Sequence, residues 1–161
     1  MKSIPVTLTV NGSNIDVEVE PRHLLSDALR DQCQLTGTHV GCEHGVCGAC
    51  TVWIDGQPAR ACLVFAVQME GHALQTIESV GEPGKLSAFQ QALHECHGLQ
   101  CGFCTPGIVM TFEAFLRDNA DPTEAEVREA LAGHLCRCTG YQNIVDAVML
   151  AAQRIREKAI S

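Results

Sequence analysis

The first part of the chain alternates between apolar and polar positions. Residues 4–10 carry Ile, Val, Leu and Val at every second position, and residues 15–19 resume the same alternation. Asn11-Gly12 between these runs tolerates the positive φ angles of a tight turn. We therefore expect a β-hairpin here, followed by a short helix over residues 24–29, where the leucines recur at helical spacing.

Shorter apolar runs later in this half predict three more strands. Residues 51–54 and 59–63 flank Asp55-Gly56, which has the composition of a second hairpin turn, and residues 73–77 predict the last strand. A loop rich in glycine and cysteine, residues 37–50, precedes them. The first half is therefore expected to be a small strand-rich domain.

The periodicity becomes helical after Gly81-Glu82-Pro83-Gly84, a run that interrupts regular structure and is a plausible linker. Thr105 is expected to be an N-cap, with Pro106 at the first helical position. Thr123 and Glu126 have the spacing of a capping box. A bundle of about four helices is predicted. Its apolar stripes span residues 86–96, 105–115, 123–131 and 142–155.

Composition changes this picture through the cysteines. The 161 residues include ten Cys, and an apolar share of 46% is enough for a packed core. The N-terminus lacks the apolar region of a signal peptide, and no window approaches the roughly 18 apolar residues of a membrane span. We therefore expect a cytoplasmic protein, in which reducing conditions disfavour disulfides and favour metal ligation by thiols.

The formal net charge of −8 bears on the partners. Because nucleic-acid phosphates would be repelled, the charge argues against nucleic-acid binding. Thiolate ligands would add further negative charge, so the protein would favour a neutral or basic docking face on a partner. The sequence has no G-x-G-x-x-G fingerprint, so the chain is not expected to bind FAD by itself.

The first cysteine set has the C-x4-C-x2-C spacing of plant-type ferredoxins that hold a 2Fe–2S cluster. Glycines in this loop let the backbone wrap tightly and point N–H groups at sulfur. Structural zinc sites instead pair two similar C-x2-C knuckles, and inert buried cysteines are the other alternative. Three ligands in one loop favour iron–sulfur, with the fourth on the strand after the second hairpin turn. The set is Cys42, Cys47, Cys50 and Cys62.

The second set combines C-x2-C with a distant C-x-C, a spacing that alone also fits zinc or a redox dithiol. Both pairs lie at predicted helix ends, where positive helix N-termini stabilise thiolates, and Arg137 can offset cluster charge. The pattern C-G-x-C-T occurs once in each half of the chain, which extends the iron–sulfur interpretation to this set. The set is Cys101, Cys104, Cys136 and Cys138.

Two cysteines and one histidine remain near these sets. Cys33 and Cys96 are interpreted as small core residues rather than ligands. His44 follows Glu43 in the first cysteine loop. It is either a group that tunes the nearby cluster or an exposed loop histidine.

Three segments, residues 41–52, 100–107 and 135–141, resemble the small iron–sulfur subunit of the xanthine oxidase family of molybdenum hydroxylases, which includes carbon monoxide dehydrogenase. The resemblance covers nearly the whole chain, and all eight ligand positions are present in order. It implies an α+β fold, with an N-terminal β-grasp, plant-type ferredoxin-like domain over residues 1–80 and a C-terminal four-helix bundle over residues 81–161. Glu43-His44 is a minor departure, at a place where the family often has Asp.

The resemblance also implies two 2Fe–2S clusters, the second set lying nearer molybdenum and the first nearer flavin. Gln100 and Cys138 would lie against the pterin of the molybdenum cofactor on a large subunit. A medium subunit would hold FAD, in a heterotrimer or a dimer of heterotrimers. Electrons would pass from molybdenum through both clusters to FAD, or in reverse in members like hydroxybenzoyl-CoA reductase. Substrate hydroxylation, with oxygen from water, would take place on the large chain.

A free-standing ferredoxin is the alternative function. Such a carrier needs only the first half of this chain and leaves the second cysteine set without a role. The substrate is not encoded in this sequence, because its pocket would lie on another polypeptide.

Overall fold

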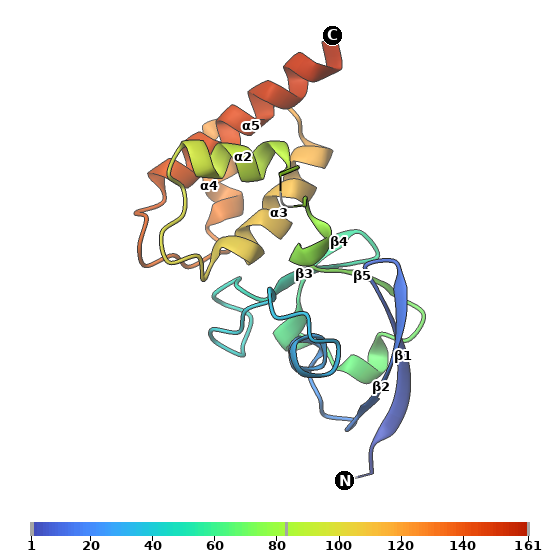
Figure 1. Ribbon diagram of the computed structural model, residues 1–161. Coiled ribbons are helices and arrows are strands. Elements are labelled where there is room, and N and C mark those ends of the chain that lie inside the picture. Colours follow the sequence, from blue (N-terminus) through green and yellow to red (C-terminus); the bar gives the residue numbers. More distant parts are fainter. Residues whose placement is uncertain (1, 83, 161) are drawn as a thin grey trace.

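The computed structural model describes residues 2–82 and 84–160, so Pro83 of the expected linker lies outside the described residues. Figure 1 shows a strand-rich half that contains the N-terminus and a helical half that contains the C-terminus, stacked end to end. The expected mixture of a sheet and helices is confirmed.

The described residues form five strands: β1 (Ile4–Val10), β2 (Ser13–Val19), β3 (Thr51–Ile54), β4 (Gln57–Arg60) and β5 (Ala73–Gln75). Their order in the sheet is β2-β1-β5-β3-β4, with only β1 and β5 parallel. Asn11 and Gly12 have φ angles of 51° and 80°, so the first hairpin turn is as predicted. Asp55 and Gly56 close the second hairpin in the same way, with φ angles of 52° and 79°.

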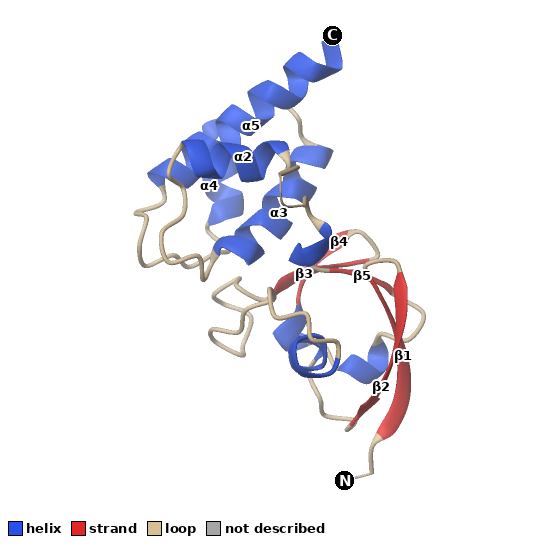
Figure 2. Cartoon of the chain, viewed as in Figure 1, coloured by secondary structure: helices blue, strands red, loops and turns tan. Residues whose placement is uncertain are grey.

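Short helical turns pack inside the curve of this sheet (Figure 2). The helix expected over residues 24–29 is a single turn, α1 (Leu25–Asp27), followed by a π-helical turn, η1 (Ala28–Gln32). Two 3-10 turns of this half follow, η2 (Ala61–Leu63) and η3 (Ala66–Gln68). A further 3-10 turn, η4 (Ile77–Ser79), packs instead against the helical core through Ile77.

The prediction of a strand over residues 59–63 is wrong beyond Arg60, where β4 ends. Cys62 lies in the η2 turn instead. Successive side chains of a strand point to opposite faces, whereas Ala61 and Cys62 are both buried, with exposed fractions of 0% and 3%. The N–H of Ala61 donates to the carbonyl of Cys50 at 3.1 Å, which turns the chain toward the cysteine loop. The strand expected over residues 73–77 likewise ends at Gln75.

The second half contains α2 (Ala88–Glu95), α3 (Thr105–Asp118), α4 (Glu124–Leu131) and α5 (Gln142–Ile160). Helix α5 packs against α2 and α4, and α3 packs against the same two helices. The rings of Phe89 and Phe112 are both buried and lie 5.5 Å apart at their centres in this core. A separate core, which includes Leu8, Leu29 and Val52, fills the strand-rich half.

The capping box at Thr123 and Glu126 is confirmed, since each side chain accepts from the other residue's backbone N–H. The expected N-cap at Thr105 is wrong, because Cys104 is the N-cap of α3. Cys104 already has helical dihedral angles, and its carbonyl accepts from the N–H of Ile108 at 3.1 Å. Helix α3 therefore begins at Thr105, directly after a cysteine of the second set.

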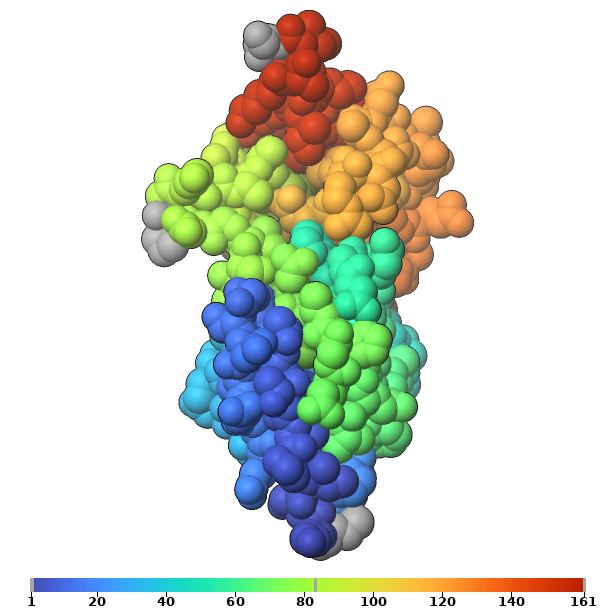
Figure 3. Space-filling view, turned by 90° about the vertical axis from the view of Figure 1, so that its right-hand side faces the viewer, coloured from blue at the N-terminus to red at the C-terminus, as the bar shows by residue number. Residues whose placement is uncertain are grey.

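Helix α3 joins the two halves by lying against β3 and β4. The indole N–H of Trp53 donates to the carbonyl of Met110 at 2.7 Å, and the Arg117 guanidinium lies 5.5 Å from the centre of the indole. In the space-filling view of Figure 3, the teal surface around residues 50–60 meets the orange surface of the helical half. Among the described residues, no helix has the length and apolar character needed to cross a membrane.

Candidate metal centres

The first cysteine set lies on the loop before β3 and on η2. The N–H of Cys47 donates to the Sγ of Cys42 at 3.4 Å. Backbone hydrogen bonds, that of Cys47 first, lower the pKa of the Cys42 thiol to about 6. Burial raises the pKa of Cys62 to about 11, and Cys50 and Cys42 contribute to the same shift. These interactions bring Cys42, Cys47, Cys50 and Cys62 into one group.

Glycine is required where this loop approaches other parts of the chain. A Cβ at Gly41 would lie 3.2 Å from the Sγ of Cys47. Gly48 has a φ of +77°, and its Cβ would lie 2.4 Å from the Nδ1 of His134. A Cβ at Gly107, in the first turn of α3, would lie 2.2 Å from the carbonyl of Gly48. The loop is therefore held closely against the second half, as expected for a tightly wrapped ligand loop.

The second set lies before α3 and between α4 and α5. The thiol of Cys138 donates to the Sγ of Cys101 at 3.5 Å. Burial first, and then a hydrogen bond with Cys136, raise the pKa of Cys104 to about 12. Cys104 is buried, whereas Cys101 and Cys138 are exposed. The structure thus brings all four predicted residues together and leaves one edge of the group at the surface.

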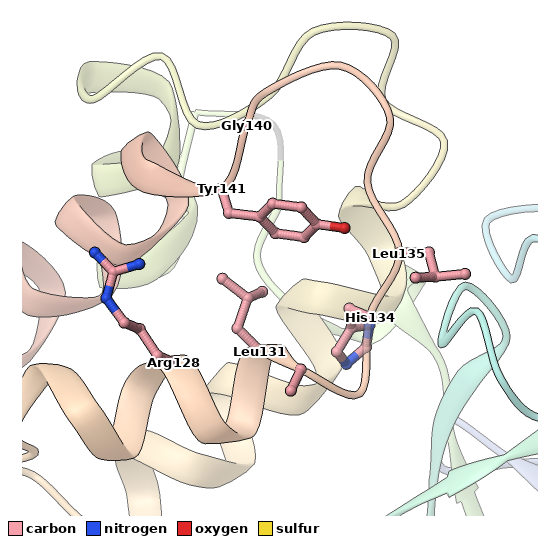
Figure 4. A pocket seen from close by; sticks show the side chains of 7 residues that line it. Arg128, Leu131, His134, Leu135, Gly140 and Tyr141 are labelled. Carbon is pink, nitrogen blue, oxygen red and sulfur yellow. The ribbon is translucent and has the colours of Figure 1, made fainter.

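Tyr141 supports the segment that carries Cys136. Its hydroxyl accepts from the N–H of Cys136 at 2.9 Å. Figure 4 shows the ring reaching across toward this segment, with His134 and Leu135 beyond it. The ring lines a cavity of about 360 Å³, together with His134 and Leu135. The role of Tyr141 was not predicted from the sequence, because it depends on the fold of the 134–141 segment, which has no regular periodicity.

Two histidines that the sequence did not single out lie between the halves. His39 stacks on Phe103 at 4.9 Å between ring centres, and its Nδ1 lies 2.8 Å from the carbonyl of Phe103. His134 is buried, and its Nε2 lies 2.8 Å from the Thr111 hydroxyl. Burial, with the Arg60 guanidinium as the second cause, lowers the pKa of His134 to about 4. Its ring is therefore neutral near physiological pH.

The remaining predicted positions fall outside the two groups of thiols. Cys33 packs against the core of the sheet and Cys96 against the helical core, which confirms both as packing residues. His44 is exposed, and its Nδ1 contacts the carbonyl of Cys42. Gln100 is exposed and lies next to Cys101 in the sequence.

Exposed apolar side chains adjoin both cysteine groups. Large apolar residues are usually buried, and an exposed cluster of them marks an interaction surface. Four such residues are each adjacent in the sequence to a cysteine of one of the two sets. They are Val46, Leu63, Phe103 and Leu135, with exposed fractions of 55%, 61%, 47% and 57%.

The donors suit a binuclear iron–sulfur cluster, in which each iron takes two thiolates. Contacts between thiols link Cys42 with Cys47 and Cys50 with Cys62 in the first group. In the second group they link Cys101 with Cys138 and Cys104 with Cys136. Within residues 2–82 and 84–160, no three Cys, His, Asp or Glu side chains are arranged to hold a single metal ion. The contacts between thiols arrange each group as two pairs.

Comparisons with known proteins agree with this chemistry. Residues 8–76 match the family model described as "2Fe-2S iron-sulfur cluster binding domain", and residues 76–149 match "[2Fe-2S] binding domain". The chain is 56% identical over 151 residues to caffeine dehydrogenase subunit gamma of Pseudomonas sp. (strain CBB1), a match that covers 92% of this chain and 90% of the relative.

Solved structures extend the likeness to the whole fold. Quinoline 2-oxidoreductase from Pseudomonas putida 86 contains a chain with a TM-score of 0.91 and 46% identity, and the match covers 98% of both chains. The chain is a small iron–sulfur subunit of the xanthine oxidase family. It belongs to an oxidoreductase.

A further relative contains a similar fold within a longer polypeptide. The aldehyde oxidoreductase from Desulfovibrio desulfuricans ATCC 27774 matches with a TM-score of 0.90 and 42% identity. The match covers 98% of the present chain but only 18% of the aldehyde oxidoreductase chain. In that relative the small subunit's fold is thus one part of a much larger protein.

Proposed function

We propose that this chain is the electron-transfer subunit of a molybdenum hydroxylase or dehydrogenase, and that it carries two 2Fe–2S clusters. The observation that carries the proposal is the presence of two separate groups of four thiols, each arranged as two pairs, in one continuous chain. When bound, each cluster accepts and releases one electron at a time.

The ligands follow from the thiol pairs. In the first centre Cys42 and Cys47 hold one iron, and Cys50 and Cys62 hold the other. In the second centre the two pairs are Cys101 with Cys138 and Cys104 with Cys136. The N–H of Cys47, which donates to Cys42, supports this assignment, because a donor to a ligating thiolate stabilises its negative charge.

Partner subunits hold the other cofactors in this proposal. A large subunit holds the molybdenum–pterin cofactor, and Gln100 and Cys138 lie against the pterin. Their exposure supports this placement, because a cofactor on another chain can reach only surface residues. A medium subunit holds FAD and receives electrons from the first centre. The exposed apolar residues beside the cysteines support docking of this kind.

The domain assignment remains part of the proposal. Residues 1–80 form the β-grasp domain and residues 81–161 the four-helix bundle, in a protein that works in the cytoplasm. The separate cores of the two halves support this division.

Copurification tests the proposal against a free-standing ferredoxin. A tagged copy, expressed with the genes that neighbour its own, should bring down one larger subunit with molybdenum and another with FAD. A monomer that exchanges electrons with soluble reductases, without either partner, would support the ferredoxin instead.

A further inference from the structure

The two cysteine groups meet through the backbone. The N–H of Leu135 donates to the carbonyl of Cys47 at 3.0 Å. Leu135 is bonded directly to Cys136, so one hydrogen bond joins a cysteine of the first group to the neighbour of a cysteine in the second. A hydrogen bond couples two redox centres electronically better than an unfilled gap of the same width, so the closure of this contact matters for electron transfer.

Arg60 spans the same junction with its side chain. It ends β4, two residues before Cys62, and is half-buried. One guanidinium nitrogen donates to the carbonyl of Gly133 at 2.7 Å, and another donates to the hydroxyl of Thr51. The Thr51 hydroxyl in turn donates to the carbonyl of Gly48 at 2.6 Å. Arg60 therefore binds the start of the 133–136 segment and, through Thr51, the 47–51 loop.

The chemistry of arginine suits this position. A guanidinium is planar and presents several donors in a fixed fork, whereas a lysine ammonium is a compact charge on a flexible stem. The two acceptors of Arg60 belong to segments that are 82 positions apart, Thr51 and Gly133. Thr51 is buried, so its hydroxyl has no ready substitute partner in water.

We propose that Arg60 is a positioning residue for electron transfer between the two centres. It holds the 133–136 segment against the 47–51 loop and so keeps the hydrogen bond between Leu135 and Cys47 closed. This inference rests on the proposed function, since it requires a cluster in each cysteine group.

Three variants separate positioning from charge. Arg60→Lys keeps the positive charge and loses the fork, Arg60→Met loses both, and Thr51→Val removes only the hydroxyl. Arg117→Met is the matched control, because Arg117 also joins the halves, by donating to the carbonyl of Gly56 at 3.0 Å, but lies away from the cysteine loops.

Two measurements report on the hydrogen bond between Leu135 and Cys47 and on its consequence for the two centres. Amide hydrogen exchange of the peptide that contains Leu135, in the reconstituted full-length chain, reports whether the hydrogen bond is closed. It should speed up roughly 10- to 100-fold in Arg60→Met, the factor that corresponds to one hydrogen bond to a charged group. In the assembled complex, electron paramagnetic resonance reports the magnetic coupling between the two reduced centres, which weakens as they separate.

The proposal predicts faster exchange and weaker coupling in Arg60→Met, Arg60→Lys and Thr51→Val, with the reduction potentials of Arg60→Lys close to those of the parent. It would be overturned if exchange and coupling stayed at parent values in all three, or if Arg117→Met changed them equally. It would also fail if only the potentials moved, because Arg60 would then act through its charge. Absence of a second reduced centre in the parent itself would instead contradict the proposed function.

Discussion

At the residue scale, a glycine can be required by its backbone conformation or by the atoms that a side chain would overlap. Gly48 and Gly71 have nearly the same φ, +77° and +83°. A Cβ at Gly71 would meet nothing within 4 Å, whereas one at Gly48 would lie 2.4 Å from the Nδ1 of His134 and 2.6 Å from the carbonyl of Gly133. The two positions therefore separate backbone strain from steric overlap.

Alanine at each position tests this difference. Gly71→Ala should cost about 1–2 kcal/mol of unfolding free energy, the strain of a left-handed residue. Gly48→Ala should cost clearly more and lower the cluster content, because the 47–51 loop must move away from the second half. Denaturant unfolding with iron analysis of both variants provides the comparison, and equal losses would contradict the packing described at Gly48.

Glu113 makes stability depend on pH. Burial raises the pKa of its carboxyl above the ordinary value of 4.5, and the Ser87 hydroxyl donates to it. The folded protein therefore keeps a proton that the unfolded chain has lost, so the stabilisation present at low pH is lost as pH rises through the raised pKa.

Glu113→Gln keeps an acceptor for Ser87 and removes the charge. The stability of the variant relative to the parent should therefore increase as pH rises above the ordinary carboxyl value of 4.5, where the unfolded chain ionises and the folded parent keeps its proton. Urea unfolding across this range measures the difference. A difference that stays constant with pH would show that the carboxyl is not perturbed by folding.

At the element scale, the capping box predicts a local cost. The Thr123 hydroxyl accepts from the N–H of Glu126 at 3.3 Å, and the Glu126 carboxylate accepts from the N–H of Thr123 at 2.7 Å. Thr123→Ala should lower the unfolding free energy by about 1 kcal/mol. Thr123→Ser should keep most of the parent's stability, because serine is also a good N-cap. Thermal unfolding of the two variants tests this, and equal stability of the alanine variant and the parent would contradict it.

Elements with strong local signals were predictable from the sequence. Asn11-Gly12 and Thr123 with Glu126 each specify a turn or a cap by their own chemistry, and the structure has both. The start of α5 at Gln142 was also expected. These features depend on residues within a few positions of one another.

Elements determined by distant contacts were not predictable. Cys62 sits in a 3-10 turn because the N–H of Ala61 binds the carbonyl of Cys50, eleven positions earlier. Helix α3 begins at Thr105, one residue earlier than the Thr-Pro signal suggested, and Cys104 is its N-cap. The π turn at residues 28–32 follows no pattern of apolar residues that we can identify.

The candidate site also has a part that the sequence predicts and a part that it does not. Spacing divided the cysteines into the same two groups that lie together in the structure, because ligand spacing is a local property of loops. The roles of Arg60, His134 and Tyr141 were not predicted, since each residue binds a segment far away in the sequence or within an irregular loop.

At the scale of the whole molecule, two packed halves hold two cysteine groups next to their junction. In the proposed assignment each centre has its own four ligands, and the helical core lies apart from the first cysteine loop. Cys47→Ser should therefore remove or strongly perturb the first cluster and leave the helices folded. Cys136→Ser should remove the second cluster and block turnover of the assembled enzyme with any acceptor.

Electron paramagnetic resonance and circular dichroism of both serine variants test these assignments. Each variant should lose a different one of the two reduced signals. Retention of both signals unchanged in either variant would refute the ligands assigned to that centre.

The most direct test of the central claim is the cluster content of the full-length chain after anaerobic reconstitution. Iron and sulfide analysis should find about four of each per chain, with two distinct 2Fe–2S signals after reduction. A chain that binds no iron, or that holds only one binuclear centre, would contradict the account.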